Sequence, residues 1–202
     1  MQLVVEDFEA YAPVILQSSP MSDAEFVKFC ERYPDCRIEC TADGEIIIMP
    51  PNFTKGSYRN SLITTQLCNW TEADGRGWAF DSSGGFVLPN GARRSPDSSW
   101  VSKARVARLP EEHLEGFFRL CPEFVVELRS ATDRLDKLQA KMTEWIDNGA
   151  ELGWLIDPRS RSVWIYRRGR TAERLEGPER LRGEGPVEGF ELDLRRVWEG
   201  IQ

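Results

Sequence analysis

The chain has 202 residues, of which 41% are hydrophobic, including seven Trp and ten Phe. This length and apolar content suit one folded domain with a sizeable core and exclude a disordered protein. The formal net charge of −7 excludes a protein coated in positive charge, but it does not exclude a local basic patch at a nucleic-acid site.

The first predicted elements are a helix, the two strands of a hairpin and a second helix, at residues 23–31, 37–40, 45–49 and 56–72. Ser22, followed three residues later by Glu25, has the form of a capping box that begins the first helix. Asp43 and Gly44 form a turn between two β-rich runs, which is a strong hairpin signal. Apolar residues at helical spacing indicate the second helix.

Four short apolar runs follow and are predicted strands, at residues 78–80, 86–88, 98–101 and 124–128. The turn at residues 89–91 separates the second run from the third. Residues 110–118 are predicted to form a short helix or a loop. Two of these strands carry an acid, because Asp97 opens the third run and Glu127 interrupts the fourth.

The last predicted elements are a helix, two strands, a polar hairpin and a tail, at residues 134–148, 152–158, 163–166, 171–181 and 189–198. Thr132 and Asp133 are expected to cap the helix, and Asn148 with Gly149 ends it. The order of helices and strands predicts an α/β domain with a mixed sheet, without internal repeats or an interdomain linker.

The chain shows no signal for export or for a membrane span. No apolar run approaches the ~20 residues that a membrane helix needs, and residues 1–7 lack a basic region followed by an apolar stretch. The five cysteines are odd in number and show no CxxC spacing, and the single His113 gives little support for zinc. We therefore expect reduced, mostly buried thiols and a cytoplasmic protein.

Asp97 and Glu127 are the most informative residues. A carboxylate set into an otherwise buried strand is costly unless it is paired, hydrogen-bonded or bound to a metal. Lys141 lies two helical turns after Arg134 on the following helix and can point toward both acids. Mg²⁺ needs only one or two carboxylates together with waters and a substrate phosphate. The ordered set Asp97, Glu127, Lys141 therefore predicts a nuclease-type active site.

These residues resemble the PD-(D/E)XK restriction-endonuclease-like superfamily, through Pro96-Asp97 and then Val126-Glu127 with a downstream lysine. More closely, residues 20–200 are similar to the bacterial Uma-two family of restriction-endonuclease-like proteins. The segments that carry this similarity are residues 37–39, 43–46, 80–86, 94–97, 122–130, 141–142, 148–150 and 154–158.

The resemblance implies a restriction-endonuclease-like α/β (α+β) fold, with a mixed β-sheet flanked by helices, an N-terminal hairpin and a C-terminal β extension. We expect a single domain over residues 1–202 with its core at about 22–170. The implied activity is that of an endodeoxyribonuclease that requires Mg²⁺ or Mn²⁺ and cleaves DNA. The implied partners are DNA and a second copy or more of the same chain, and no membrane.

The resemblance also assigns roles to residues. Asp97 and Glu127 would bind the metal, and Glu39 would be a further acid near it. The superfamily's usual lysine would fall at position 129, where this chain has Arg129, and an Arg cannot act as a base. The resemblance therefore implies that Lys141 takes this role. Arg129 and Arg94 are the candidates for contacts to substrate phosphate.

Each of these residues also has a purely structural interpretation. Asp97 would be a turn carboxylate bonded to local backbone, and Glu127 an acid on an edge strand. For both we favour the functional interpretation. Glu39 is equally consistent with the solvent face of the hairpin, and Lys141 with a solvated helix surface. Asp81 is expected only to begin the turn that follows it.

Two other classes of function stay open. One is a non-catalytic nucleic-acid-binding or regulatory protein on the same fold, because the altered E-x-K pattern at Arg129 is consistent with lost chemistry. The other is a structural protein that assembles into homodimers or higher homo-oligomers through a C-terminal hairpin at residues 167–182.

Overall fold

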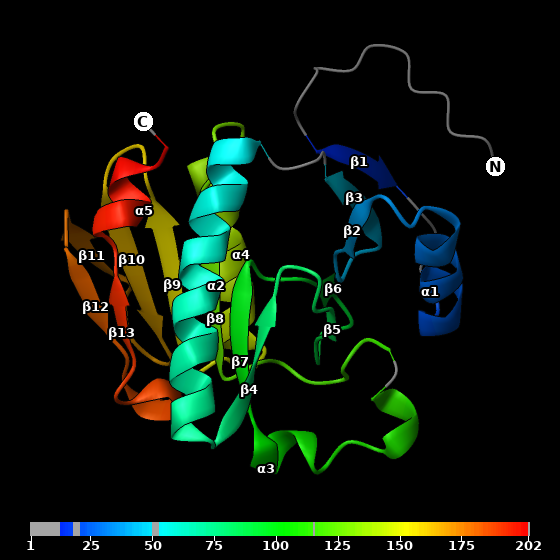
Figure 1. Ribbon diagram of the computed structural model, residues 1–202. Coiled ribbons are helices and arrows are strands. Elements are labelled where there is room, and N and C mark those ends of the chain that lie inside the picture. Colours follow the sequence, from blue (N-terminus) through cyan, green and yellow to red (C-terminus); the bar gives the residue numbers. More distant parts are fainter. Residues whose placement is uncertain (1–12, 18–20, 50–52, 115, 202) are drawn as a thin grey trace.

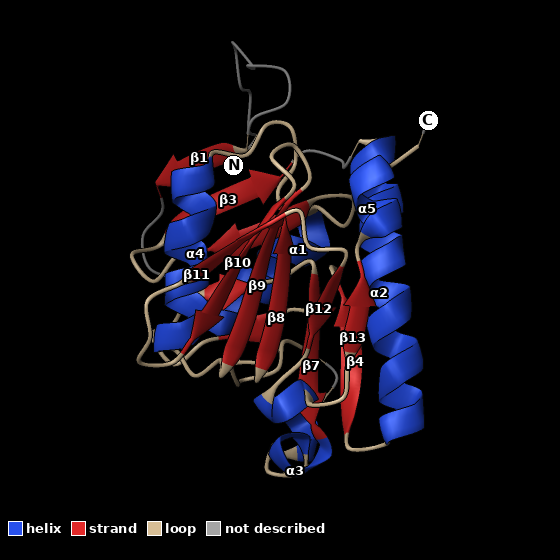
Figure 2. Ribbon diagram, turned by 90° about the vertical axis from the view of Figure 1, so that its left-hand side faces the viewer, coloured by secondary structure: helices blue, strands red, loops and turns tan. Residues whose placement is uncertain are grey.

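The computed structural model describes residues 13–17, 21–49, 53–114 and 116–201. Its helices cover the two faces of a central sheet and one face of a smaller sheet (Figures 1 and 2). They are α1 (Asp23–Arg32), α2 (Thr54–Asp74), α3 (Lys103–Val106), α4 (Leu135–Asp147) and α5 (Arg195–Glu199), with 3₁₀ turns at Glu111–His113 and Gly185–Val187.

The central sheet has six strands in the order β11-β10-β9-β8-β7-β4. They are β4 (Gly77–Asp81), β7 (Ser98–Ser102), β8 (Phe124–Leu128), β9 (Leu152–Asp157), β10 (Ser162–Arg167) and β11 (Glu173–Glu176). Strands β8 and β9 run parallel, and the other neighbours are antiparallel. A parallel pair needs a crossover connection, which α4 supplies. The expected mixed sheet flanked by helices is confirmed.

The alternation of side chains along β8 decides what faces each helix. Val126 packs with Leu67 of α2 in one apolar cluster, whereas Val125 packs with Trp145 of α4 in another. Since successive side chains of a strand point to opposite faces, Glu127 shares the α4 face with Val125. Figure 2 shows α2 and α4 on opposite sides of the sheet. The fold thus directs Glu127 toward α4.

A second sheet lies beside the central one and has the order β1-β3-β2-β6-β5 (Figure 1). Its strands are β1 (Val14–Gln17), β2 (Arg37–Cys40), β3 (Glu45–Met49), β5 (Phe86–Val87) and β6 (Arg93–Arg94). Ile38 and Cys40 pack with Phe26 of α1. Arg37 and Glu39 therefore point the other way, toward the central sheet and α4. Glu39 is buried, so it does not lie on a solvent face of the hairpin.

The predicted cap of the first helix is confirmed, whereas the predicted cap of α4 is not. Ser22 caps α1 and exchanges hydrogen bonds with Glu25, as the capping box predicts. The cap expected before α4 is wrong: the N-cap residue is Arg134, without a side-chain hydrogen bond. Asp133 instead accepts a hydrogen bond from the backbone N–H of Ser130, which is 2.7 Å away. This bond stabilises the loop between β8 and α4 rather than the helix end.

The polar hairpin expected at residues 171–181 is also wrong. Strand β11 pairs with β10, whereas β12 (Arg180–Arg182) pairs with β13 (Glu191–Asp193) in a separate two-stranded sheet. Gly177 has a φ of 58° and lies between the two strands. Leu181 and Leu192 belong to the cluster under α2, so the burial of these side chains draws β12 away from β11.

The five cysteines are free thiols, but only Cys40 and Cys121 are buried. Cys30 and Cys68 are partly exposed and Cys36 is exposed, so the expectation of mostly buried thiols is wrong. In the part of the chain that the structure describes, no helix combines the length and the apolar character that crossing a membrane requires.

The approach of α4 to the sheet depends on Gly153 in β9. A Cβ atom at this position would overlap the terminal methyl group of Met142 and lie 3.4 Å from a methyl carbon of Val125. We expect Gly153→Ala to lower the free energy of unfolding by about 1–3 kcal/mol, because overpacking displaces Met142. Urea denaturation at neutral pH measures this change.

Gly56 in α2 gives the matched control, because nothing lies within 4 Å of a Cβ atom added there. Gly56→Ala should raise the free energy of unfolding by roughly 0.5–1 kcal/mol through helix propensity alone. Unchanged stability in Gly153→Ala would contradict the close helix–sheet packing.

Candidate functional site

Asp97 lies immediately before β7 and is held by three elements that are distant in sequence. Its Oδ2 accepts a hydrogen bond from the backbone N–H of Leu128 at 2.8 Å. Its Oδ1 accepts from Arg37 of β2 at 3.1 Å and from the amide of Asn60 of α2 at 3.3 Å. None of these partners is local, so the turn interpretation of Asp97 is wrong.

Glu127 lies on β8, which has a neighbour on both sides and is not an edge strand. Its Oε1 forms an ion pair with the Lys141 ammonium at 2.8 Å and accepts a hydrogen bond from the Trp145 indole N–H at 3.0 Å. Both donors reach the same oxygen, and among the described residues Oε2 has no donor. The side chain is thus oriented by α4 with one oxygen left available.

Glu39 completes the set from the second sheet. Its Oε1 accepts hydrogen bonds from Lys141 at 2.9 Å and from the backbone N–H of Ser95 at 3.1 Å. Its Oε2 accepts from Arg94 at 3.2 Å. The Lys141 ammonium therefore bridges Glu39 and Glu127 and is not a solvated surface group. The structure brings all four predicted catalytic residues to one region.

The two glutamates shift their pKa in opposite directions. Burial raises the pKa of Glu127 to about 7, and the charges of Asp97 and Glu39 add to this although Lys141 opposes it. Burial also disfavours ionised Glu39, but Lys141, Arg94 and Arg37 lower its pKa to about 2. The difference follows from the number of cations, because Glu127 has one close cation and two nearby acids.

Lys141 remains an ammonium in this environment. Burial lowers its pKa, but Glu127 and Glu39 outweigh that effect and raise the pKa above the ordinary value. Lys141 is therefore a hydrogen-bond donor at neutral pH and not a base.

The two arginines expected to contact phosphate are differently placed. Arg129 lines the cavity described below, and its guanidinium donates to Asp157 at 2.8 Å. Arg94 is buried, donates to Glu144 at 2.7 Å as well as to Glu39, and does not line the cavity. The geometry therefore does not support Arg94 as a phosphate contact, because it is a buried counter-ion of two glutamates. The role of Arg129 stays a prediction.

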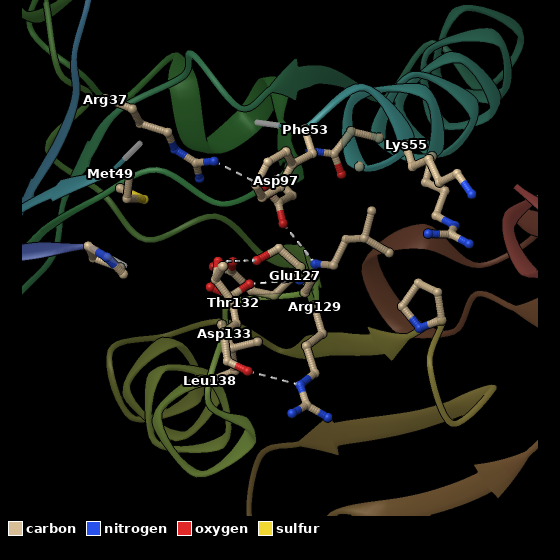
Figure 3. Close-up of a pocket in the computed structure, with 18 of the residues that line it drawn as sticks. Arg37, Met49, Phe53, Lys55, Asp97, Glu127, Arg129, Thr132, Asp133 and Leu138 are labelled. Atoms are coloured by element: carbon tan, nitrogen blue, oxygen red, sulfur yellow. Dashed lines mark hydrogen bonds and ion pairs between the residues drawn. The ribbon is translucent and has the colours of Figure 1, made fainter. Parts of the chain in front are cut away.

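A cavity of about 790 Å³ opens above these acids. Asp97, Glu127 and Lys141 line it, whereas Glu39 does not and lies behind Lys141. In Figure 3 the carboxylates of Asp97 and Glu127 lie between segments from β2, α2 and α4. The reactive groups are thus recessed in a concave site, where ligands usually bind.

Sequence reasoning missed three residues that orient the acids, namely Arg37, Asn60 and Trp145. Arg37 lies two positions before Glu39 and therefore on the same face of β2. Trp145 lies four positions after Lys141 and therefore on the same face of α4. These two spacings could have predicted that Arg37 and Trp145 lie near the site. Asn60 has no such spacing, because its contact with Asp97 depends on how α2 packs on the sheet. Asp81, as expected, only accepts a turn hydrogen bond, from Ser83.

The donor set fits one hard divalent cation. Within the described ranges, no three His, Cys, Asp or Glu side chains gather in a way that could hold a metal ion. Mg²⁺ does not need three, because one or two carboxylates with waters and a phosphate are sufficient. Asp97 and Glu127 both line the cavity, and Glu127 has one close cation, Lys141, which it shares with Glu39. These two residues would hold the ion.

Comparison with known proteins places the chain among nuclease-like folds. A family model described as "Uma2: Putative restriction endonuclease" matches residues 23–195. A crystal structure described as a putative nuclease belonging to DUF820 from Anabaena variabilis has 22% identity and a TM-score of 0.72, and the match covers 89% of this chain and 98% of that chain. At this identity the likeness shows a shared fold. A search of curated proteins found no match.

The pKa of Glu127 predicts how stability depends on pH in the presence of EDTA. The folded-state pKa of about 7 lies above the ordinary 4.5, so the folded protein binds this proton more tightly. The resulting stability is complete below pH 4.5 and is lost as pH rises through 7. Relative to Glu127→Gln, the wild type should lose about 2–3 kcal/mol of unfolding free energy between pH 4.5 and pH 8.

Urea denaturation at several pH values measures this difference. Glu176→Gln is the control, because Glu176 is exposed on β11, and it should follow the wild type at every pH. A wild type that gains stability over Glu127→Gln as pH rises would contradict the environment described for Glu127.

Proposed function

The chain belongs to the Uma2 family of putative restriction endonucleases, and from this premise we propose that it is a nuclease that depends on a divalent metal ion and hydrolyses phosphodiester bonds of DNA. One observation supports the proposal most directly. Lys141 from α4 lies within 2.9 Å of both Glu127 and Glu39. A lysine thus stands beside the paired acids although position 129 is an arginine that is held by Asp157.

Asp97 and Glu127 would hold the cation at the floor of the cavity. When bound, a divalent ion lowers the pKa of a coordinated water and offsets the charge of the scissile phosphate. The protein fixes both carboxylates beforehand: Arg37, Asn60 and the Leu128 N–H hold Asp97, and Trp145 and Lys141 hold Glu127. This preorganisation reduces the reorganisation needed during the reaction.

Lys141 acts through its positive charge. Its pKa is raised, so at neutral pH it donates hydrogen bonds and cannot accept a proton from water. An ammonium beside the reacting phosphate orients the attacking water and offsets the charge that develops on the phosphate oxygens. Glu39 is a positioning residue, because it holds the ammonium from the side away from the cavity.

Cleavage assays on plasmid and single-stranded DNA with Mg²⁺ or Mn²⁺ test the proposal. We expect Asp97→Asn and Glu127→Gln to reduce cleavage to background, because each removes a charged metal ligand. Lys141→Met should lower the rate by about 10²–10³-fold, the usual cost of losing one preorganised donor.

Lys137→Met is the matched control, because Lys137 is an exposed lysine one turn earlier on α4, and it should keep the wild-type rate. A wild type that cleaves no faster than Asp97→Asn on any of these substrates would overturn the proposed activity. If such a protein still binds DNA, a non-catalytic nucleic-acid-binding role is the better explanation.

Isothermal titration calorimetry with Mn²⁺ and no DNA tests the metal site separately. The wild type should bind the ion, and Glu127→Gln should show no measurable heat, because Gln supplies no charge to the cation. Glu176→Gln should bind like the wild type. Equal binding by Glu127→Gln would place the metal elsewhere.

A further inference from the structure

The wall of the cavity carries more positive than negative charge, although the chain as a whole carries −7. Of the residues that the structure describes, six that line it are cationic: Arg37, Lys55, Arg59, Arg129, Lys141 and Arg159. Four of the described lining residues are acidic: Asp35, Asp97, Glu127 and Asp133. An acidic protein that gathers cations around one concave site creates a local attraction for an anion, and this attraction does not depend on the net charge.

Two of these cations are exposed and have no acidic partner among the described residues, although the Arg159 guanidinium donates a hydrogen bond to the Ala131 carbonyl at 3.3 Å. Arg37 and Lys141 are bound to the site carboxylates, and Arg129 to Asp157. Arg59 is partly buried and donates to the Val197 carbonyl at 2.8 Å. Lys55 and Arg159 are exposed, and neither forms a salt bridge with any residue that the structure describes. Exposed cations without an acidic partner are suited to bind the phosphates of a ligand.

Lys55 and Arg159 reach the cavity from two different elements. Lys55 lies in the first turn of α2, the helix whose Asn60 bonds to Asp97. Arg159 lies in the turn after β9, the strand that pairs with β8 and places Leu155 opposite Glu127. Both residues therefore line the same cavity as Asp97 and Glu127.

The depth of the acids favours a single strand over a duplex. Asp97 is 9% exposed and Glu127 is 2% exposed, so a scissile phosphate has to enter the cavity to reach them. A DNA duplex is stiff, with a persistence length of about 150 bp, and bending it sharply costs energy. A single strand has a flexible backbone, and its bases can be splayed apart. The cavity volume of about 790 Å³ suits a few ordered groups of such a strand.

Phe53 supplies a surface for a base. Its side chain is 47% exposed and lines the same cavity, and Figure 3 shows it on the side from which Lys55 approaches. An aromatic ring beside cations is the combination by which proteins bind single strands without base-specific hydrogen bonds.

We infer that the cavity binds single-stranded DNA, with strand phosphates on Lys55 and Arg159 and one base stacked on Phe53. This inference rests on the proposed function and names its substrate class. A nuclease with such a site acts on single strands, frayed ends or flaps before it acts on intact duplex.

Fluorescence anisotropy in EDTA tests the inference without cleavage. A labelled single-stranded 12-mer and the corresponding duplex are titrated with the full chain at several salt concentrations. We expect the single strand to bind at least tenfold more tightly. Lys55→Ala and Arg159→Ala should each weaken binding severalfold and reduce the slope of log Kd against log salt by about 0.7. Phe53→Ala should weaken binding roughly tenfold and leave the slope unchanged, because stacking releases no counterions.

Arg108→Ala is the control for non-specific charge. Arg108 is an exposed arginine beyond α3, at the opposite end of β7 from Asp97, and its loss should leave binding unchanged. Duplex binding as tight as that of the single strand, or equal losses in Arg108→Ala and Lys55→Ala, would overturn the inference. If Lys55→Ala and Arg159→Ala cleave DNA as fast as the wild type, the inferred single-strand site is wrong, but the proposed nuclease activity still holds. Strand binding as expected, without cleavage, would instead refute only the nuclease.

Discussion

The ammonium of Lys141 connects the three parts of the molecule that form the site. It lies on α4, bonds to Glu127 on the central sheet and bonds to Glu39 on the second sheet. A buried charge is stable only when it is paired and hydrogen-bonded, so these contacts fix how the two sheets and the helix pack. The same interaction that satisfies the lysine therefore also aligns the acids at the floor of the cavity.

The two glutamates share this lysine but have different chemical states. Glu39 has three cations around it and stays ionised to low pH, so it is a permanent counter-ion. Burial, together with repulsion by Asp97 and Glu39, raises the pKa of Glu127 to about 7, although Lys141 opposes this effect. A divalent cation would add positive charge beside Glu127. Glu39 is therefore a positioning acid and Glu127 an acid suited to bind an ion. The two have the same side chain, and their roles differ because the charged groups around them differ.

Much of the fold could be predicted because the signals are local. The capping box at Ser22, the Asp43-Gly44 turn and the apolar spacing of α2 each depend on residues within one or two turns of each other. Predictions failed where a side chain bonds or packs with a partner other than the one that the local sequence suggests. Asp133 bonds to Ser130 instead of capping α4, and Leu181 is drawn into the main core instead of pairing back along a hairpin. Arg94 was expected to meet phosphate and instead pairs with Glu144 and Glu39.

The sequence by itself determined most of the element types, the position of Asp97 at the start of one strand and of Glu127 within another, and the family resemblance, because these depend on periodicity and on short motifs. Only the tertiary structure decided which of two equally reasonable roles Glu39 and Lys141 have. Both residues are polar groups on amphipathic elements, and nothing local distinguishes a solvent face from a face covered by another layer. The packing of the second sheet and α4 against β8 buries both, and burial turns them into an ion pair at the site.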